Sequence, residues 1–145
     1  MDFFSAMNVG SSALTAERTR MNLISSNLAN ANTTRTAEGG PYKRKDAVFT
    51  AAPLGNSFGR TLDGAVGQQV SQVQVSRIVE DQNPPRMQYD PSHPDADPQG
   101  YVAMPNVNVM EEMTDMLSAS RAYEANVTAV QAAKNMALKT LEISK

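Results

Sequence analysis

The chain's single histidine, His93, stands among carboxylates in a way that invites a metal-binding interpretation. The neighbouring aspartates are Asp90, Asp95 and Asp97. The segment from Asp95 also imitates the first half of a calcium-binding loop, but the twelfth position, where such a loop needs a bidentate glutamate, is Asn106. Pro98 interrupts the loop as well. We therefore interpret this segment as a proline-stiffened surface stretch and expect no bound metal.

A second acidic group, Glu111, Glu112 and Asp115, could be taken for the paired carboxylates of an acid–base catalyst. It stands at the start of an expected helix, where negative charge complements the helix dipole, so we interpret it as structural. The sequence has no cysteine, no Gly-x-Ser-x-Gly motif and no glycine-rich phosphate loop after a strand. We expect no catalytic residues, no enzymatic activity and no cofactor.

Charge and hydropathy narrow the possible partners. The net charge is −2, and the basic run Lys43-Arg44-Lys45 is short enough to be the solvated end of a strand. We therefore expect no nucleic-acid binding. No stretch of about 18 apolar residues exists, and the first residues lack a basic, then apolar, leader pattern. We expect neither direct membrane insertion nor a cleavable signal peptide.

Helix-breaking residues divide the chain into three parts. Residues 1–34 and 108–145 contain no proline, whereas residues 35–107 hold all eight prolines and seven of the eight glycines. This distribution predicts a mainly α protein with an N-terminal axial helix, a small β-hairpin and Pro-rich extended middle region, and a C-terminal axial helix.

Apolar residues recur at alternating spacings of four and three in both end segments, which is the heptad rhythm of a coiled-coil-like rod. Asp2 and Asn108 are the expected N-caps of the two helices. Two such stripes need more partners than one chain offers, so we expect the stripes to form an assembly interface with other chains. Its expected residues are Phe3, Met7, Leu14, Met21, Ile24, Leu28, Val109, Met113, Met116, Tyr123, Val127, Val130 and Leu141.

The polar face of the first helix is made of Ser, Thr and Asn rather than the Glu and Lys typical of a solvated helix. Such small side chains permit close approach, which favours a segment that orders on assembly. An ordinary hairpin with the C-terminal helix is the alternative. In the middle region, Gln72 to Val79 alternates as a strand, and Tyr42 to Phe49 is a weaker strand that could pair with it. We expect a flexible loop over residues 53–69 and an extended segment without regular ladders over 83–105.

Three stretches carry a resemblance to a known family. Residues 12–34, from Ser-Ala-Leu-Thr-Ala-Glu-Arg to Ala-Asn-Thr-Thr, resemble the N-terminal signature of flagellar rod and hook proteins. Residues 108–143, including Arg-Ala-Tyr-Glu-Ala-Asn, resemble their C-terminal signature. The stretch Tyr-Asp-Pro-Ser-His-Pro-Asp-Ala-Asp-Pro-Gln-Gly-Tyr-Val-Ala-Met-Pro-Asn-Val-Asn at 89–108 resembles proximal-rod proteins of the FlgC type.

The resemblance implies a structural subunit of the flagellar basal body that polymerises through its terminal helices into a hollow, torque-transmitting drive shaft. It implies self-association in a helical assembly, with other rod proteins and the rod–ring adaptor as neighbours. It also implies delivery by the flagellar type III export apparatus to the periplasmic rod. Two other functions stay open on the sequence: a soluble coiled-coil adaptor or chaperone, and an enzyme of unknown class.

Overall fold

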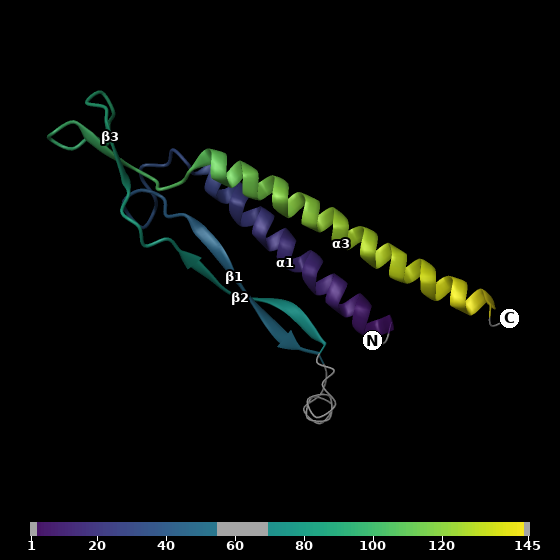
Figure 1. Cartoon of the computed structure of the whole chain (residues 1–145). Helices are drawn as coiled ribbons and strands as arrows, with labels where there is room; N and C mark the ends of the chain where they lie inside the picture. Colours follow the sequence, from purple (N-terminus) through teal and green to yellow (C-terminus); the bar gives the residue numbers. More distant parts are fainter. Residues whose placement is uncertain (1–2, 55–69, 144–145) are drawn as a thin grey trace.

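The computed structural model describes residues 3–54 and 70–143. Two long helices, α1 (Phe3–Ala29) and α3 (Val109–Ile143), lie side by side, and the two small antiparallel sheets come between them in the chain (Figure 1). The predicted architecture of two long terminal helices around a small β region is confirmed at this level. The expected cap Asp2 and residues 55–69 of the expected loop lie outside the described residues.

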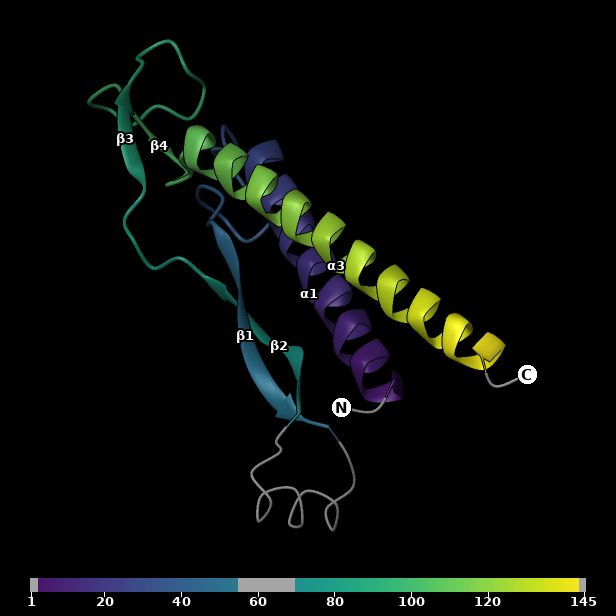
Figure 2. The same cartoon turned by 45° about the vertical axis from the view of Figure 1, so that its right-hand side comes forward.

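The helix pair is antiparallel, and two contacts define its register. Near one end, a Cβ atom placed on Gly10 would lie 2.5 Å from Val130 Cγ2, so α1 approaches α3 there closely enough to require glycine. Near the other end, the Asn27 side chain bonds to Glu112. Counting outward from the first contact places Phe3 opposite about Ala137. The last turn and a half of α3 therefore extends beyond α1, as both views show (Figure 2).

The start of α3 differs from the predicted pattern. The capping role of Asn108 is confirmed, because its Oδ1 accepts a hydrogen bond of 3.2 Å from the backbone N–H of Met110. The buried residues of α3, however, are Glu112 and Ala119, while Val109 and Met113 are exposed. The exposure of Val109 and Met113 leaves the predicted contact with other chains untested, whereas the burial of Glu112 was not expected from the sequence.

The larger sheet is a hairpin that lies along α1. Strand β1 (Lys45–Pro53) pairs antiparallel with β2 (Ser71–Glu80), and a bulge opposite Val48 and Phe49 shifts the register. The backbone N–H of Val73 donates to Ser12 Oγ of α1 at 3.1 Å. The predicted strand and its weaker partner are both present, although β1 begins later than Tyr42 and runs on to Pro53.

The second sheet corrects the expectation of an extended segment without ladders. Strands β3 (Arg86–Tyr89) and β4 (Tyr101–Met104) pair antiparallel, and the rings of Tyr89 and Tyr101 meet edge to face with centroids 5.3 Å apart. The intervening loop can close because Gly100 has φ of +83° and because Asp97 Oδ1 accepts bonds from the backbone N–H groups of Gln99 and Tyr101. Hydrogen bonds to a loop side chain therefore bring together two short strands. The surrounding prolines are the reason that the sequence predicts no strand pairing here.

The buried core is small and lies in two places. Ile24 and Ala119 are buried on the two helices, and Ala16 is buried on the side of α1 that faces Val73 of β2. Val102 and Val107 are buried near the start of α3, with Ala31 from the exit of α1. Much apolar surface stays outside these two cores.

Candidate assembly surfaces and the junction that positions them

A buried polar junction joins α1, α3 and the start of the hairpin. Its centre is Asn27, which is 1% exposed. Asn27 Nδ2 donates to Glu112 Oε2 at 3.0 Å and to the Lys45 carbonyl at 2.9 Å. Its Oδ1 accepts from the Lys45 backbone N–H at 2.9 Å and from the Tyr42 hydroxyl at 3.0 Å. The amide thus makes four bonds, its full capacity.

The second half of the junction is an ion pair. Glu112 is 1% exposed, and its Oε1 accepts a 2.6 Å bond from Arg44 Nε. Arg44 also lies near Asp46, 3.4 Å away, and Asp115, 3.9 Å away. Burial alone would lower the pKa of Arg44, but the hydrogen bond and charge of Glu112, with Asp46, outweigh it and raise that pKa. Arg44 therefore stays charged and neutralises the buried carboxylate.

This junction changes two interpretations made from the sequence. Glu112 lies in the first turn of α3, but its carboxylate is buried against Arg44 and Asn27 rather than acting only on the helix dipole. Likewise, Arg44 is not simply part of a solvated strand end, since less than a quarter of its side chain is exposed. The sequence signal that could have found the junction is an Asn among the apolar positions of α1 together with a lone Arg ahead of a strand.

The residues of the predicted assembly interface fall into three groups by exposure. Ile24 is buried in this single chain. The half-buried residues are Met7, Leu14, Met21, Leu28, Met116, Tyr123, Val127 and Val130. The exposed residues are Phe3, Val109, Met113 and Leu141. The one chain thus covers most of both stripes in part and leaves uncovered the beginning of the α1 stripe and both ends of the α3 stripe.

Exposed apolar side chains gather at both ends of the helix pair. We call the group at the beginning of α3 the start cluster: Val109, Met110, Met113 and Leu117. We call the group at the opposite end the end cluster: Phe3, Phe4, Leu138, Leu141 and Ile143. In the start cluster, the spacing of Met110, Met113 and Leu117 puts them on one face of the helix. In the end cluster, Leu141 is 67% exposed because α1 does not reach it.

The balance of charge differs between the two clusters, although the exposed acid Glu142 also lies at the end cluster. Glu111 is exposed beside the start cluster, and Lys134 and Lys139 are exposed near the end cluster. The hairpin adds further exposed apolar side chains, which are Phe49, Val73, Ile78 and Val79. Each of these surfaces is apolar enough to associate with another protein surface.

The segment around His93 is built by local turns. Asp90 Oδ1 accepts bonds from the backbone N–H and the hydroxyl of Ser92, and these bonds lower the pKa of Asp90. His93 Nδ1 accepts from the backbone N–H of Asp95, whose carboxylate accepts a 2.8 Å bond from Thr34 Oγ1. Within residues 3–54 and 70–143, no group of three or more His, Cys, Asp or Glu side chains is placed to hold a metal ion.

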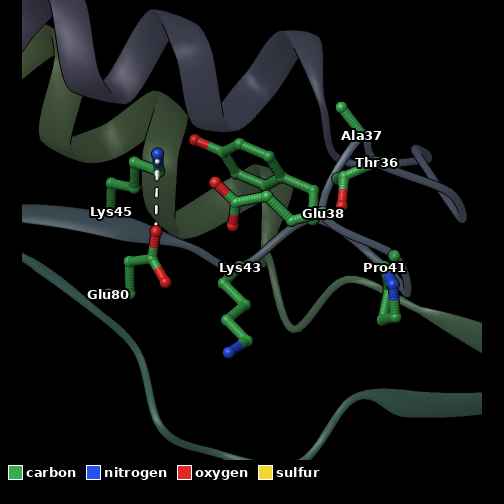
Figure 3. Close-up of a pocket in the computed structure, with 9 residues that line it drawn as sticks. Thr36, Ala37, Glu38, Pro41, Lys43, Lys45 and Glu80 are labelled. Atoms are coloured by element: carbon green, nitrogen blue, oxygen red, sulfur yellow. Dashed lines mark ion pairs between the residues drawn. The ribbon is translucent and has the colours of Figure 1, made fainter.

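The cavities are open and shallow. One of about 320 Å³ lies between the turn at residues 36–41 and the start of the hairpin (Figure 3). Across it, Lys45 Nζ and Glu80 Oε1 form a 3.5 Å ion pair, with both side chains about 40% exposed. Such an exposed pair contributes little binding energy, and the cavity carries no arrangement that suggests chemistry. No helix in the described part of the chain is long and apolar enough to cross a membrane.

Comparisons with known proteins match both ends of the chain and then its whole length. A family described as "Flagella basal body rod protein" matches residues 7–35, which cover most of α1. A second, described as "Flagellar basal body rod FlgEFG protein C-terminal", matches residues 99–143, which cover β4 and α3. The two matched segments are the ones that meet at the junction of Asn27 and Glu112.

Whole-length relatives agree with these matches. The flagellar basal-body rod protein FlgC of Borreliella burgdorferi is 45% identical over 99% of this chain and 98% of its own. FlgC of Bacillus subtilis is 45% identical and FlgC of Salmonella typhimurium 39% identical, each over 100% of both chains. These relatives are structural rod proteins, and they give no support to the soluble adaptor or chaperone alternative. The chain belongs to the FlgC family of flagellar basal-body rod proteins.

Proposed function

We propose that this rod subunit polymerises through the exposed ends of its helix pair to build a hollow, torque-transmitting shaft. The observation that carries the proposal is the exposed apolar surface at both ends, above all Leu141, which α3 carries beyond the end of α1. A lone soluble domain would gain stability by covering such residues. Their exposure is explained if a neighbouring subunit covers them.

The contacts we propose are helix against helix. In the assembled rod, coiled-coil-like packing would extend the stripes that the single chain only half covers. Near the end cluster, Lys134 and Lys139 outnumber the acid Glu142. This balance favours a neighbour that approaches end to end rather than one related by a two-fold axis, because an end-to-end contact brings Glu111 toward Lys139. Repetition of such a contact builds an open, extended assembly.

The same proposal includes the remaining partners and the location. Other rod proteins and the rod–ring adaptor are the neighbours, and the rod lies in the periplasm. Delivery occurs through the flagellar type III export apparatus. Membership of the FlgC family supports these partners, this location and this delivery route together. The proposed function includes no catalytic activity.

The decisive experiment changes a residue that assembly needs and the single chain does not. We expect Leu141→Asp to abolish swimming and incorporation into basal bodies, while circular dichroism of the purified chain stays unchanged because Leu141 is exposed. Glu142→Ala, at the next and equally exposed position, is the control and should swim. Normal swimming and normal rod incorporation of Leu141→Asp would show that this end is not an assembly surface.

A further inference from the structure

We infer that the junction of Asn27, Arg44 and Glu112 sets the register in which α1 packs along α3. Apolar residues recur at alternating spacings of four and three in the sequences of both helices, and such a repeating pattern permits slippage by one repeat. The junction is the place along the pair where buried side chains of α1 and α3 are joined by a hydrogen bond in the described structure. This inference concerns the single chain and does not depend on the proposed function.

The remainder of the helix contact distinguishes poorly between registers. Its buried residues include Ala119, which is small and fits many positions. Methionines such as Met21 and Met116 are half-buried there, and their flexible side chains adapt to different neighbours. A shift of one repeat would exchange similar apolar contacts, so packing alone leaves the native register weakly favoured. The close approach of Gly10 to Val130 leaves no room for a larger side chain at that point, but it involves no directional bond.

The junction penalises that shift because its groups are buried and directional. A slip of seven residues moves Asn27 about 10 Å along the helix axis, at about 1.5 Å per residue. The backbone of Lys45 is hydrogen-bonded to the Asn27 side chain, so the start of the hairpin, including Arg44, would move together with Asn27. Glu112 would then lose both the Asn27 and the Arg44 bonds and keep a buried, uncompensated charge. Fixing a register is a well-attested use of a buried polar group.

The absence of native cysteines allows register to be measured by disulfide formation in the full-length chain. In the native register, a Cβ on Gly10 would lie 3.9 Å from Val130 Cβ, within the range that a disulfide spans. The pair Gly10→Cys with Val130→Cys therefore reports the native register. The pairs Gly10→Cys with Tyr123→Cys and Gly10→Cys with Ala137→Cys report slips of one repeat in the two directions. Both carry Val130→Ala as well, which removes the Cγ2 atom that would lie 2.5 Å from the new Cβ.

In the otherwise native chain, we expect the first pair to oxidise to an intramolecular disulfide and the two slipped pairs to stay reduced. Adding Glu112→Leu should lower the disulfide yield of the native pair several-fold and raise the disulfide yield of at least one slipped pair. Helicity should change little, because leucine is a good helix former. The matched control is Glu111→Leu, which removes the neighbouring, exposed acid and should leave all three yields unchanged.

A second variant covers the case in which Glu112→Leu unfolds the chain. Arg44→Gln leaves every residue of both helices in place, since Arg44 lies before β1, and should shift the yields in the same direction. If the native pair keeps its yield and the slipped pairs stay reduced in a helical Arg44→Gln chain, the junction does not set the register. The same conclusion follows if both variants only lower helicity without producing a slipped disulfide.

Discussion

Asn27 shows how much a single side chain can specify when it is fully buried and fully bonded. Its four bonds reach three separate parts of the chain: the tyrosine ahead of the hairpin, the first residue of β1 and the first turn of α3. A smaller apolar residue would fit the space but would leave Glu112 and the Lys45 backbone without these partners. Asn27 is therefore the residue at which local helix structure and tertiary structure depend on each other.

We predict that Asn27→Ala lowers the free energy of unfolding by several kcal/mol, since each buried group left without a partner costs about 1–3 kcal/mol. Denaturant unfolding followed by circular dichroism measures the change. Asn22→Ala, on the exposed side of the same helix, is the control and should differ from the native chain by about 0.5 kcal/mol or less. Equal effects of the two substitutions would contradict the role given to Asn27.

Glu17 presents the opposite situation. Its Oε2 is buried and has no hydrogen-bond partner among the described residues. We predict that Glu17→Met stabilises the isolated chain by about 1 kcal/mol, because the substitution removes an unsatisfied polar atom and keeps a long side chain and a helix-forming residue. Thermal unfolding should show a higher midpoint than in the native chain. A lower midpoint would mean that the carboxylate has a stabilising partner after all.

At the scale of elements, the small sheet of β3 and β4 depends on its loop. Gly100 combines a φ of +83° with a tight contact, since an added Cβ would lie 2.9 Å from Tyr89 Cε2. Gly39 has a similar φ of +89° but open space around it. Comparing substitutions at the two glycines therefore distinguishes the cost of a left-handed backbone from the cost of a clash with a neighbouring side chain.

We predict that Gly39→Ala destabilises the chain by about 1–2 kcal/mol through backbone strain alone. Gly100→Ala should cost more than this, because strain and the clash with Tyr89 act together. Hydrogen exchange of the Asp90 backbone N–H, which bonds to the Gly100 carbonyl, should speed up in Gly100→Ala and stay unchanged in Gly39→Ala. Equal stability of the two variants would show that the tyrosine moves aside freely.

The elements differ in how far the sequence could predict them. Both helices, the cap Asn108 and the strand over residues 71–80 follow from local patterns of breakers, capping residues and alternation. The ladder of β3 and β4 was missed because its strands have four residues each and proline-rich surroundings, and because turn bonds from Asp97 hold them together. The buried position of Glu112 was missed for another reason: its partners are 68 and 85 residues away in the chain.

At the scale of the whole molecule, most of the predicted assembly residues stay untested as contacts with other subunits. What the single chain establishes is which of them it already covers: Ile24 is buried, whereas Phe3, Val109, Met113 and Leu141 are exposed. The periodicity of a sequence shows which residues share a helix face, but it does not show which molecule covers that face. That information lies in the partner, so no pattern within one chain supplies it.

We predict that Leu117→Asp, in the start cluster, stops rod assembly without destabilising the isolated chain, because the side chain is 61% exposed and contributes little to its own core. Swimming in soft agar and the protein content of isolated basal bodies give the readout, with thermal unfolding of the purified chain as the stability measurement. Ser118→Asp adds the same charge at the next exposed position and should assemble. Loss of swimming in both variants would point to charge alone rather than to the apolar face.

The unequal lengths of the two helices have a mechanical consequence. Because α3 continues for about six residues past Phe3, the end of the subunit is a step about 9 Å deep rather than a flat face. In the proposed assembly, a neighbour seated on that step would overlap the subunit sideways, as timbers do in a lap joint. Torque on the shaft would then load this sideways contact in shear and would not pull the ends of two subunits apart. Such a contact suits a shaft that transmits rotation.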